Sequence, residues 1–334
     1  MRSRSVGTVL ITGGAGYIGS HTAWACLEAG LRVVVLDNLT TGSRRLIPPA
    51  AVFVEGAVED QERVHDLVRT YEVGAVVHLA ASTVIAESMV NPEKYHRNNT
   101  FNSSKLLETL AALGGVPFIL SSTAAVYAPT ASKRLSETAA IGPVSPYGLS
   151  KLRAEQVLAA AARGYDFPYL ALRYFNVAGA DPLGRTGPPA SGGSHLLQAA
   201  TQAALGVRAS LPIHGRDHAT PDGACVRDYI HVSDLAQIHV HALDHLVRGG
   251  ASGVINCGSG QGRSVLDVVA AFEAELGRAL PTRDAPPRLG DLDCVVADAT
   301  KLRHALPDWT PRHAGLEPIV SSALAWERRR LAVV

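Results

Sequence analysis

The first half of the chain alternates short apolar runs with longer stretches of helical spacing. The apolar runs are rich in β-branched residues and leucine and do not alternate with polar residues, as expected for strands buried on both faces of a parallel sheet. We expect strands over Thr8–Thr12, Arg32–Leu36, Ala51–Glu55, Ala75–Ala80, Phe118–Ser122 and Tyr169–Arg173. Helices are expected over Tyr17–Ala29, Asp60–Tyr71, Pro92–Leu113 and Pro146–Arg163. Strand and helix in alternation predict an α/β fold with a doubly wound parallel sheet.

The pattern changes after Asn176. Residues 180–193 are rich in glycine and proline, which predicts a loop. Beyond this loop, helical pieces and short strands predict a smaller mixed α/β domain at the C-terminal end. We therefore divide the chain into residues 1–176 and 177–334, and we expect the helix over His231–Val247 to pack back on the first domain.

Composition narrows the class of protein. The chain has 334 residues, which is long for a single core, and it is 47% hydrophobic and 18% charged, as in ordinary globular proteins. A net charge of +1 gives no electrostatic case for nucleic acid or an anionic membrane as partner. We expect neither a signal peptide nor a membrane span, because no run approaches the roughly 20 apolar residues that a span needs.

The cysteines indicate neither a metal site nor a disulfide framework. Cys26, Cys225, Cys257 and Cys294 are widely scattered and form no CxxC pair. We interpret them as reduced cysteines of a cytoplasmic protein.

Three glycines follow the first strand with the spacing GxxGxxG. Gly13 would let the chain turn sharply, Gly16 would let the backbone approach a pyrophosphate, and Gly19 would let the helix pack on the strand. A helix that begins at Tyr17 and Ile18 offers free N–H groups and a positive dipole end to phosphates. A tight turn alone would also use three glycines, but the position between a strand and a helix is the context of a Rossmann-type dinucleotide site.

An acidic residue ends the second predicted strand. Asp37 lies 18 residues after Gly19, where a carboxylate binds the ribose hydroxyls and repels a 2′-phosphate. This favours NAD over NADP, the alternative being a solvated aspartate in a turn. Arg44 and Arg45 would favour a phosphate, but they lie well past the strand end, and we interpret them as surface charges.

A tyrosine and a lysine four residues apart are the candidate catalytic pair. Tyr147 and Lys151 share one helix face, and a charged lysine favours the phenolate, as would the positive nicotinamide of an oxidised cofactor. Thr123 lies just past the apolar run that ends at the carboxyl edge of the sheet, where open sheets place their chemistry. These three residues could deprotonate an alcohol next to a nicotinamide. A casual surface pair of Tyr147 and Lys151 is the alternative.

Together the motifs resemble the extended short-chain dehydrogenase/reductase family, and within it the UDP-sugar 4-epimerases. The resemblance covers nearly the whole chain. The segments that carry it are Thr12–His21, Leu36–Leu39, His78–Ala81, Ala86–Ser88, Asn98-Asn99, Ser121–Tyr127, Ser145–Lys151, Arg173–Gly179, Val226–Val232 and Ser264–Val269. The segments RYFN and VRDYIHV are much more specific than the glycines.

The resemblance implies a mechanism. The first domain would hold NAD and the second a UDP-sugar, with UDP-glucose and UDP-galactose first among the substrates. Tyr147 would take the proton of the sugar 4-hydroxyl, helped by Thr123, while hydride leaves C4 and later returns to its other face. UDP-N-acetylhexosamines, UDP-pentoses and UDP-uronic acids stay open as substrates. A homodimer is implied in the same way.

The resemblance also assigns the site residues. The cofactor would be held by residues at the ends of the first strands and on the catalytic helix: Gly13, Gly16, Tyr17, Ile18, Gly19, Asp37, Asn38, Ala57, Val58, Leu79, Ala80, Ala81, Asn98, Ser121, Tyr147, Lys151 and Phe175. The UDP-sugar would contact Thr83, Thr123, Tyr147, Asn176, His195, Leu211, Pro212, Ile213, Arg227, Arg288, Asp291 and Val295.

The two arginines and His195 have structural alternatives. Arg227 and Arg288 suit a diphosphate because a guanidinium binds phosphate oxygens in bidentate fashion. Arg227 could instead pair with Asp228, and Arg288 with Asp291. His195 could be a polar helix cap.

Several positions depart from the family pattern. Ala57 replaces an acid that would bind the adenine amine, and Thr83 replaces a lysine that reaches the substrate in some relatives. Val295 replaces a bulky tyrosine of some members. The smaller side chain predicts tolerance of an N-acetyl group at C2, although Val295 could equally be a core residue.

The residues after Thr123 help to distinguish an epimerase from other enzymes with the same fold. A 4,6-dehydratase needs an acid and a base beside this hydroxyl, and Ala124 and Ala125 have no proton to exchange. A net reductase stays open. A sensor that binds NAD without chemistry stays open too, although such a protein would usually lack Tyr147 or Lys151.

Overall fold

The computed structural model describes residues 7–130, 132, 134–189, 196–287 and 292–332. Its largest element is a seven-stranded sheet in the order β11-β7-β5-β4-β1-β2-β3, and every neighbouring pair is parallel. The strands are β1 (Thr8–Thr12), β2 (Arg32–Asp37), β3 (Val52–Glu55), β4 (Val73–His78), β5 (Phe118–Thr123), β7 (Tyr169–Tyr174) and β11 (Gly253–Cys257). The predicted doubly wound parallel sheet is therefore confirmed.

Helices cover both faces of this sheet, which explains the unbroken apolar runs. Within β1, Val9 and Ile11 pack towards α1 and α8, whereas Leu10 packs towards α2, α5 and α6. Alternate residues of each strand thus enter different cores, and both must be apolar. These helices are α1 (Tyr17–Glu28), α2 (Gln61–Thr70), α5 (Asn102–Ala112), α6 (Pro146–Tyr165) and α8 (Val232–Val247), and α10 (Thr300–Ala305) joins the side of α1 and α8.

The segment between β4 and α5 is helical but irregular. It contains α3 (Ile85–Val90), α4 (Pro92–Tyr95) and a π-helical turn, η2 (His96–Phe101), which runs directly into α5. Short 3-10 turns follow β2 and β5, namely η1 (Arg44–Leu46) and η3 (Ala124–Val126).

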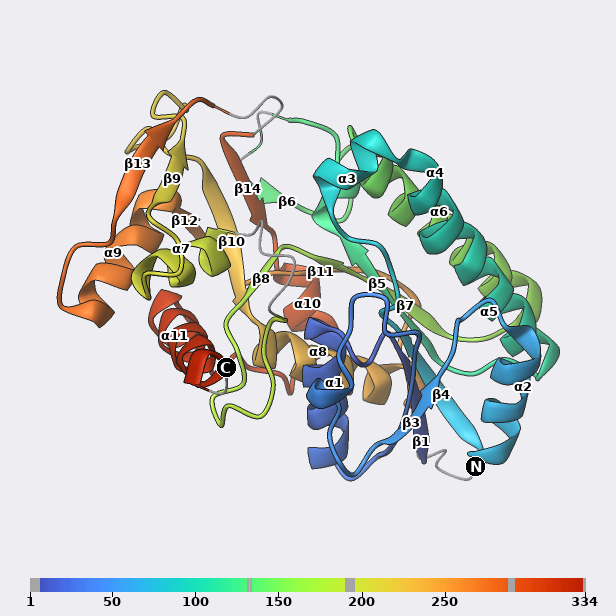
Figure 1. Ribbon diagram of the computed structural model, residues 1–334. Coiled ribbons are helices and arrows are strands. Elements are labelled where there is room, and N and C mark those ends of the chain that lie inside the picture. The colour runs from blue at the N-terminus through green and yellow to red at the C-terminus, as the bar shows by residue number, and fades with distance from the viewer. Residues whose placement is uncertain (1–6, 131, 133, 190–195, 288–291, 333–334) are drawn as a thin grey trace.

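The remaining elements form a smaller α/β part with its own core. One sheet has the order β12-β10-β14-β6 with β8 added beside β10, and β9 pairs with β13. The strands are β6 (Arg134–Leu135), β8 (Asn176–Ala178), β9 (Leu211–His214), β10 (Val226–His231), β12 (Gly262–Ser264), β13 (Thr282–Ala285) and β14 (Cys294–Ala297). The helices α7 (Leu196–Ala204), α9 (Val265–Leu276) and α11 (Leu316–Ala332) cover it, away from α5 and α6 (Figure 1).

The chain returns to the first sheet after residue 176. β11 pairs with β7, and α8 packs against α1. The division at residue 176 stays a prediction. β11 and α8 come after this residue in the sequence, but in the structure they pack with the seven-stranded sheet and α1.

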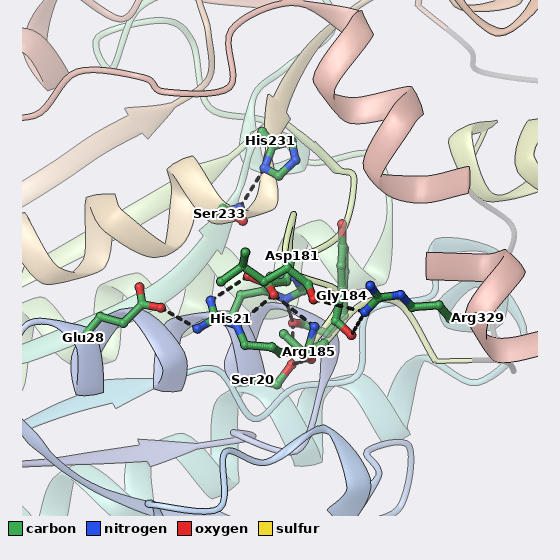
Figure 2. A network of polar contacts seen from close by, with 12 residues as sticks. Ser20, His21, Glu28, Asp181, Gly184, Arg185, His231, Ser233 and Arg329 are labelled. Carbon is green, nitrogen blue, oxygen red and sulfur yellow. Dashed lines mark hydrogen bonds and ion pairs between the residues drawn. The ribbon is translucent and has the colours of Figure 1, made fainter. Parts of the chain in front are cut away.

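A polar network ties α1 to the smaller part (Figure 2). The guanidinium of Arg185 donates to Asp181 and, at 2.6 Å, to Glu28 of α1. The hydroxyls of Ser20 and Thr186 lie 2.6 Å apart, and Arg329 of α11 donates to the carbonyls of Leu183 and Gly184. The first helix is therefore fixed relative to both parts of the molecule.

Candidate active site

The glycine turn has the geometry of a phosphate cradle. Gly13 adopts φ +71°, and a Cβ at Gly19 would overlap the carbonyl oxygen of Gly13. Gly16 is the N-cap of α1 and has no side chain, and the first turn, with Tyr17 and Ile18, contains no acidic residue. Within the described residues, no side chain caps this helix start. The N–H groups and the positive helix end are thus free for an anion, which fits the pyrophosphate of NAD.

Asp37 is fixed by the same turn. It is buried at the end of β2, where Oδ2 accepts from the N–H of Ala15 at 2.9 Å and Oδ1 from the N–H of Leu39 at 2.8 Å. Each oxygen keeps a second lone pair, so the carboxylate can still accept from two hydroxyls. The exposed side chain of Asn38 accepts from Thr40 instead.

The other predicted cofactor residues lie at the same edge of the sheet. Ala57 and Val58 follow β3, and the half-buried residues Leu79, Ala80 and Ala81 follow β4. Ser121 is at the end of β5, and Phe175 follows β7. Because parallel strands end at one edge, residues far apart in the sequence come together there. Ala57 offers no side-chain acceptor, as the sequence indicates.

The π-helical turn η2 organises the loop after β4. Asn98 donates to the hydroxyl of Ser82 at 3.0 Å. Asn99 is buried, accepts from the N–H of Ser82 at 2.7 Å, and donates to the Ser82 carbonyl and to Ser150 on α6. Asn99 and Ser82 are not among the site residues expected from the sequence. The adjacent pair Asn98-Asn99 was the available signal, and both of its side chains contact Ser82.

Tyr147, Thr123 and Lys151 form the centre of the site. Ser145 caps α6 by accepting from Gly148 N–H, which places Tyr147 in the first turn, opposite the end of β5. Burial raises the pKa of the Tyr147 phenol, and its hydrogen bond with the Thr123 hydroxyl lowers it. Thr123 Oγ1 also accepts from the N–H of Ala125 at 3.1 Å.

Lys151 donates its hydrogen bonds to strand β5. Its ammonium is buried and donates to the carbonyl and hydroxyl oxygens of Ser121, at 2.8 and 3.0 Å. Burial lowers the pKa of Lys151 to about 8, and the Glu155 carboxylate raises it. The effect of the Lys151 charge on Tyr147 stays a prediction, and the hydrogen bonds of the ammonium go to Ser121.

A second tyrosine packs against the first. The rings of Tyr95 and Tyr147 meet edge to face, with centroids 6.3 Å apart. The Tyr95 hydroxyl donates towards the Val84 carbonyl at 2.6 Å and lies 2.8 Å from Glu87. Tyr95 is fully buried, so it fixes the position of the Tyr147 ring and of the loop before α3.

Behind β4, a buried chain of hydrogen bonds supports the glycine turn. Thr12 Oγ1 lies 2.6 Å from His78 Nδ1, and His78 Nε2 lies 2.7 Å from Ser103 Oγ. Burial, with a smaller contribution from the Lys151 charge, lowers the pKa of His78 to about 3. His78 is therefore a neutral structural residue.

The predicted substrate residues are distributed around the smaller part. Thr83 is exposed beside α3, Asn176 begins β8, and Leu211, Pro212 and Ile213 lie on β9, with Leu211 and Ile213 buried. Val295 on β14 is the register partner of Arg227 on β10. His195, Arg288 and Asp291 lie outside the described residues.

Arg227 and Asp228 do not act as one ion pair. The Arg227 guanidinium donates to the carbonyls of Val226 and Leu292, at 2.8 and 2.7 Å. Asp228 is fully buried and accepts from Ser259, Gly260 and Ala297, so it joins β10 to the neighbouring chain segments.

Two further observations bear on the class of protein. The described part of the chain contains no cluster of three or more His, Cys, Asp or Glu side chains suited to a metal ion. None of its helices is both long and apolar enough to cross a membrane.

Comparison with known proteins gives consistent matches. Residues 9–258 match the model of the NAD dependent epimerase/dehydratase family. The UDP-glucose 4-epimerase of Azospirillum brasilense is 48% identical over 320 residues, covering 96% of this chain and 92% of that protein.

Two solved structures are similar over nearly their full length. One is a UDP-glucose-4-epimerase from Stenotrophomonas maltophila with bound NAD and formylated UDP-arabinopyranose. It has a TM-score of 0.94 at 36% identity, and the match covers 98% of this chain and 99% of that one. The UDP-Glc/GlcNAc 4-epimerase of Campylobacter jejuni has a TM-score of 0.84 at 41% identity, with coverage of 97% of this chain and 99% of that one.

Proposed function

The chain belongs to the NAD dependent epimerase/dehydratase family, and from this premise we propose that it is an NAD-dependent 4-epimerase that interconverts UDP-glucose and UDP-galactose. The observation that carries the proposal is the placement of Thr123 beside Tyr147 at the carboxyl edge of the sheet, where Thr123 lowers the pKa of the phenol, near a glycine turn and Asp37 that fit NAD. The relatives named above carry this activity in their names.

Tyr147 moves the proton. Its phenolic oxygen takes the proton of the sugar 4-hydroxyl as C4 is oxidised and gives it back when C4 is reduced. NAD, when bound, supplies the acceptor for the C4 hydride and returns it. Thr123 Oγ stabilises the phenolate by hydrogen bonding, and the Lys151 ammonium adds positive charge on the same helix face.

The cofactor residues hold NAD in three places. The N–H groups after Gly16 receive the pyrophosphate, Asp37 receives the ribose hydroxyls, and Ser121 with Lys151 forms the polar wall beside Tyr147. Because the sugar must be reduced by the cofactor that oxidised it, both stay in the site throughout a turnover.

Arg227 is our candidate for the diphosphate of the UDP-sugar. Its guanidinium is half-buried on β10, and Val295 lies beside it in register. Turnover of UDP-N-acetylglucosamine is the second candidate function. It is supported by the small side chain of Val295 and by the named activity of the Campylobacter jejuni relative.

We further infer a homodimer that acts in the cytoplasm. The support is the resemblance itself, the exposed Phe101 side chain at the start of the α5 segment, with 56% of its surface accessible, and four free cysteines. Light scattering on the purified protein tests the oligomer, and a monomer at micromolar concentration would contradict it.

The activity is tested by incubating the protein with UDP-glucose and resolving the C4 stereoisomer. Tyr147→Phe should lower kcat by about 10²- to 10⁴-fold, because the proton acceptor is lost. Tyr165→Phe is the matched control, since Tyr165 lies exposed at the far end of the same helix. Wild-type protein that forms no epimer from any UDP-hexose, UDP-pentose or UDP-uronic acid would refute the proposal.

A further inference from the structure

Three residues of α6 engage three successive residues of β5. Tyr147 lies beside Thr123, which lowers its pKa, Lys151 donates to Ser121, and Ser122 donates to Glu155. Tyr147, Lys151 and Glu155 are spaced four apart, so they lie on one face of the helix over two turns. Glu155 thus continues the line of the catalytic pair into the core.

Glu155 is buried, with 7% of its surface exposed, and its carboxylate accepts three hydrogen bonds, from Ser122 and from two nitrogens of Arg173. Arg173 on β7 binds it in bidentate fashion, with Nε to Oε1 at 2.9 Å and Nη2 to Oε2 at 2.7 Å. The guanidinium also lies over the Tyr127 ring, 4.9 Å from its centroid. This arrangement holds the carboxylate in one orientation.

A buried ion pair is a poor device for stability alone, because desolvation of two charges offsets most of the attraction. The position of this pair is informative for another reason. The Lys151 ammonium touches only neutral oxygens of Ser121 in its hydrogen bonds, and it is 3% exposed. Burial favours its neutral form, and the Glu155 charge opposes that tendency.

The other titratable groups around this centre do not supply that charge. They are Tyr147 on the same helix, His78 on β4, Tyr95 on α4, and Arg173 and Tyr174 on β7. Burial raises the pKa of the three tyrosines and lowers that of His78, which favours the neutral form of each, and Arg173 is itself a cation.

We propose that Glu155 is a positioning residue of the reaction: from one turn further along α6 it keeps Lys151 charged and aligned with Tyr147, while Arg173 and Ser122 hold its carboxylate in place. This inference rests on the proposed function, because it concerns the protonation of the group beside the reaction's base. Through Glu155, the catalytic pair of Tyr147 and Lys151 would be linked to Arg173 on β7.

The test compares the pH dependence of kcat in wild type, Glu155→Gln and Glu155→Asp. In Glu155→Gln the alkaline limb of the profile should move down by about one pH unit, because Lys151 loses its proton more easily. Glu155→Asp keeps the charge and should restore the limb to within a few tenths of a unit. A Glu155→Gln profile that coincides with wild type, with only a lower melting temperature, would overturn the proposal.

Glu155→Gln leaves the Arg173 cation buried without a counter-charge and could prevent folding. The double variant Glu155→Gln/Arg173→Met removes both charges, so it keeps the test decisive: its alkaline limb should also move down. The Lys151 titration is also followed by NMR on protein with ¹³C-labelled lysine. An unchanged Lys151 pKa in the double variant refutes the inference, whether or not the wild type is active. If the Lys151 pKa falls but wild type forms no epimer, the proposed function alone has failed.

Discussion

The Thr123 hydroxyl is held by the backbone of its own loop and acts on the phenol of Tyr147. Its oxygen accepts from Ala125 N–H at 3.1 Å. This bond fixes the hydroxyl, which lowers a tyrosine pKa that burial raises. Thr123 is therefore the neutral group that most directly favours the phenolate.

Replacement of Thr123 by Val should consequently slow the reaction. The pKa of Tyr147 should rise, and each unit of rise removes about tenfold of the phenolate at a fixed pH below it. We expect kcat to fall at least tenfold at pH 7, with the acid limb of its pH profile displaced to higher pH. Thr123→Ser keeps the hydroxyl and serves as control. An unshifted acid limb in Thr123→Val would show that the hydrogen bond has no such role.

Much of this arrangement could be predicted from the sequence, because its signals are local. Gly13, Gly16 and Gly19 are needed where a strand turns tightly into a helix, and the runs around Val9 and Val33 must be apolar on both faces of a parallel strand. The role of Asp37 could be predicted from its position at the end of such a strand.

Other features depend on long-range packing and left no local signal. β11 joins the first sheet from beyond the predicted boundary at residue 176, because only pairing with β7 places it there. The π-helical turn that orients Asn98 and Asn99 interrupts a segment whose pattern predicts one continuous helix. Lys151 turns to the Ser121 carbonyl, which becomes its neighbour only after β5 and α6 have packed.

Ala57 predicts a cofactor that is held less firmly at its adenine end. It is half-buried just after β3 and offers no acceptor for the adenine amine. Ala57→Asp should slow the loss of bound NAD and lower its Kd about tenfold, since a hydrogen bond to a charged group contributes about 1.5 kcal/mol or more. Ala57→Val is the control without an acceptor. Equal effects of both variants on NAD retention, measured by calorimetry, would contradict the assignment.

The stability of the fold should decrease in mild acid because of its buried histidines. Burial lowers the pKa of His21 to about 4, and that of His231 to about 3, where the charges of His313 and His21 contribute. Both histidines lie in the network of Figure 2, close to Asp181. In the unfolded chain a histidine titrates near 6.5, so above that pH neither state binds the proton and nothing is lost.

As the pH falls from 6.5 towards 4, the unfolded chain binds protons that the folded chain excludes, and the free energy of unfolding decreases. His21→Gln removes one such group while an amide can still donate to the Tyr17 carbonyl, which His21 Nδ1 contacts at 2.7 Å. The free energy of unfolding, measured with urea, should decrease between pH 7 and pH 4 in both proteins. The decrease should be smaller in this variant than in wild type, by up to about 3 kcal/mol. The same loss in both proteins would exclude His21 as a source of acid sensitivity.

Val295 should set the size of the sugar that the site accepts. It is half-buried on β14, next to the apolar cluster of Tyr127 and Phe175 and in register with Arg227. If the space beside it admits an N-acetyl group, wild type turns over UDP-N-acetylglucosamine as well as UDP-glucose. Val295→Tyr should then lower kcat/KM for the acetylated substrate about 100-fold and for UDP-glucose only a few-fold.

A bulky residue in this cluster also carries an overpacking cost of about 1–3 kcal/mol, so the melting temperature is measured alongside the rates. Val295→Ile adds a single methylene and should preserve both activities, which separates size from mere substitution. Equal losses on the two substrates in Val295→Tyr would make Val295 a core residue without influence on specificity. A wild-type protein that ignores the acetylated substrate while epimerising UDP-glucose would lead to the same conclusion, because the space would then be closed by other side chains.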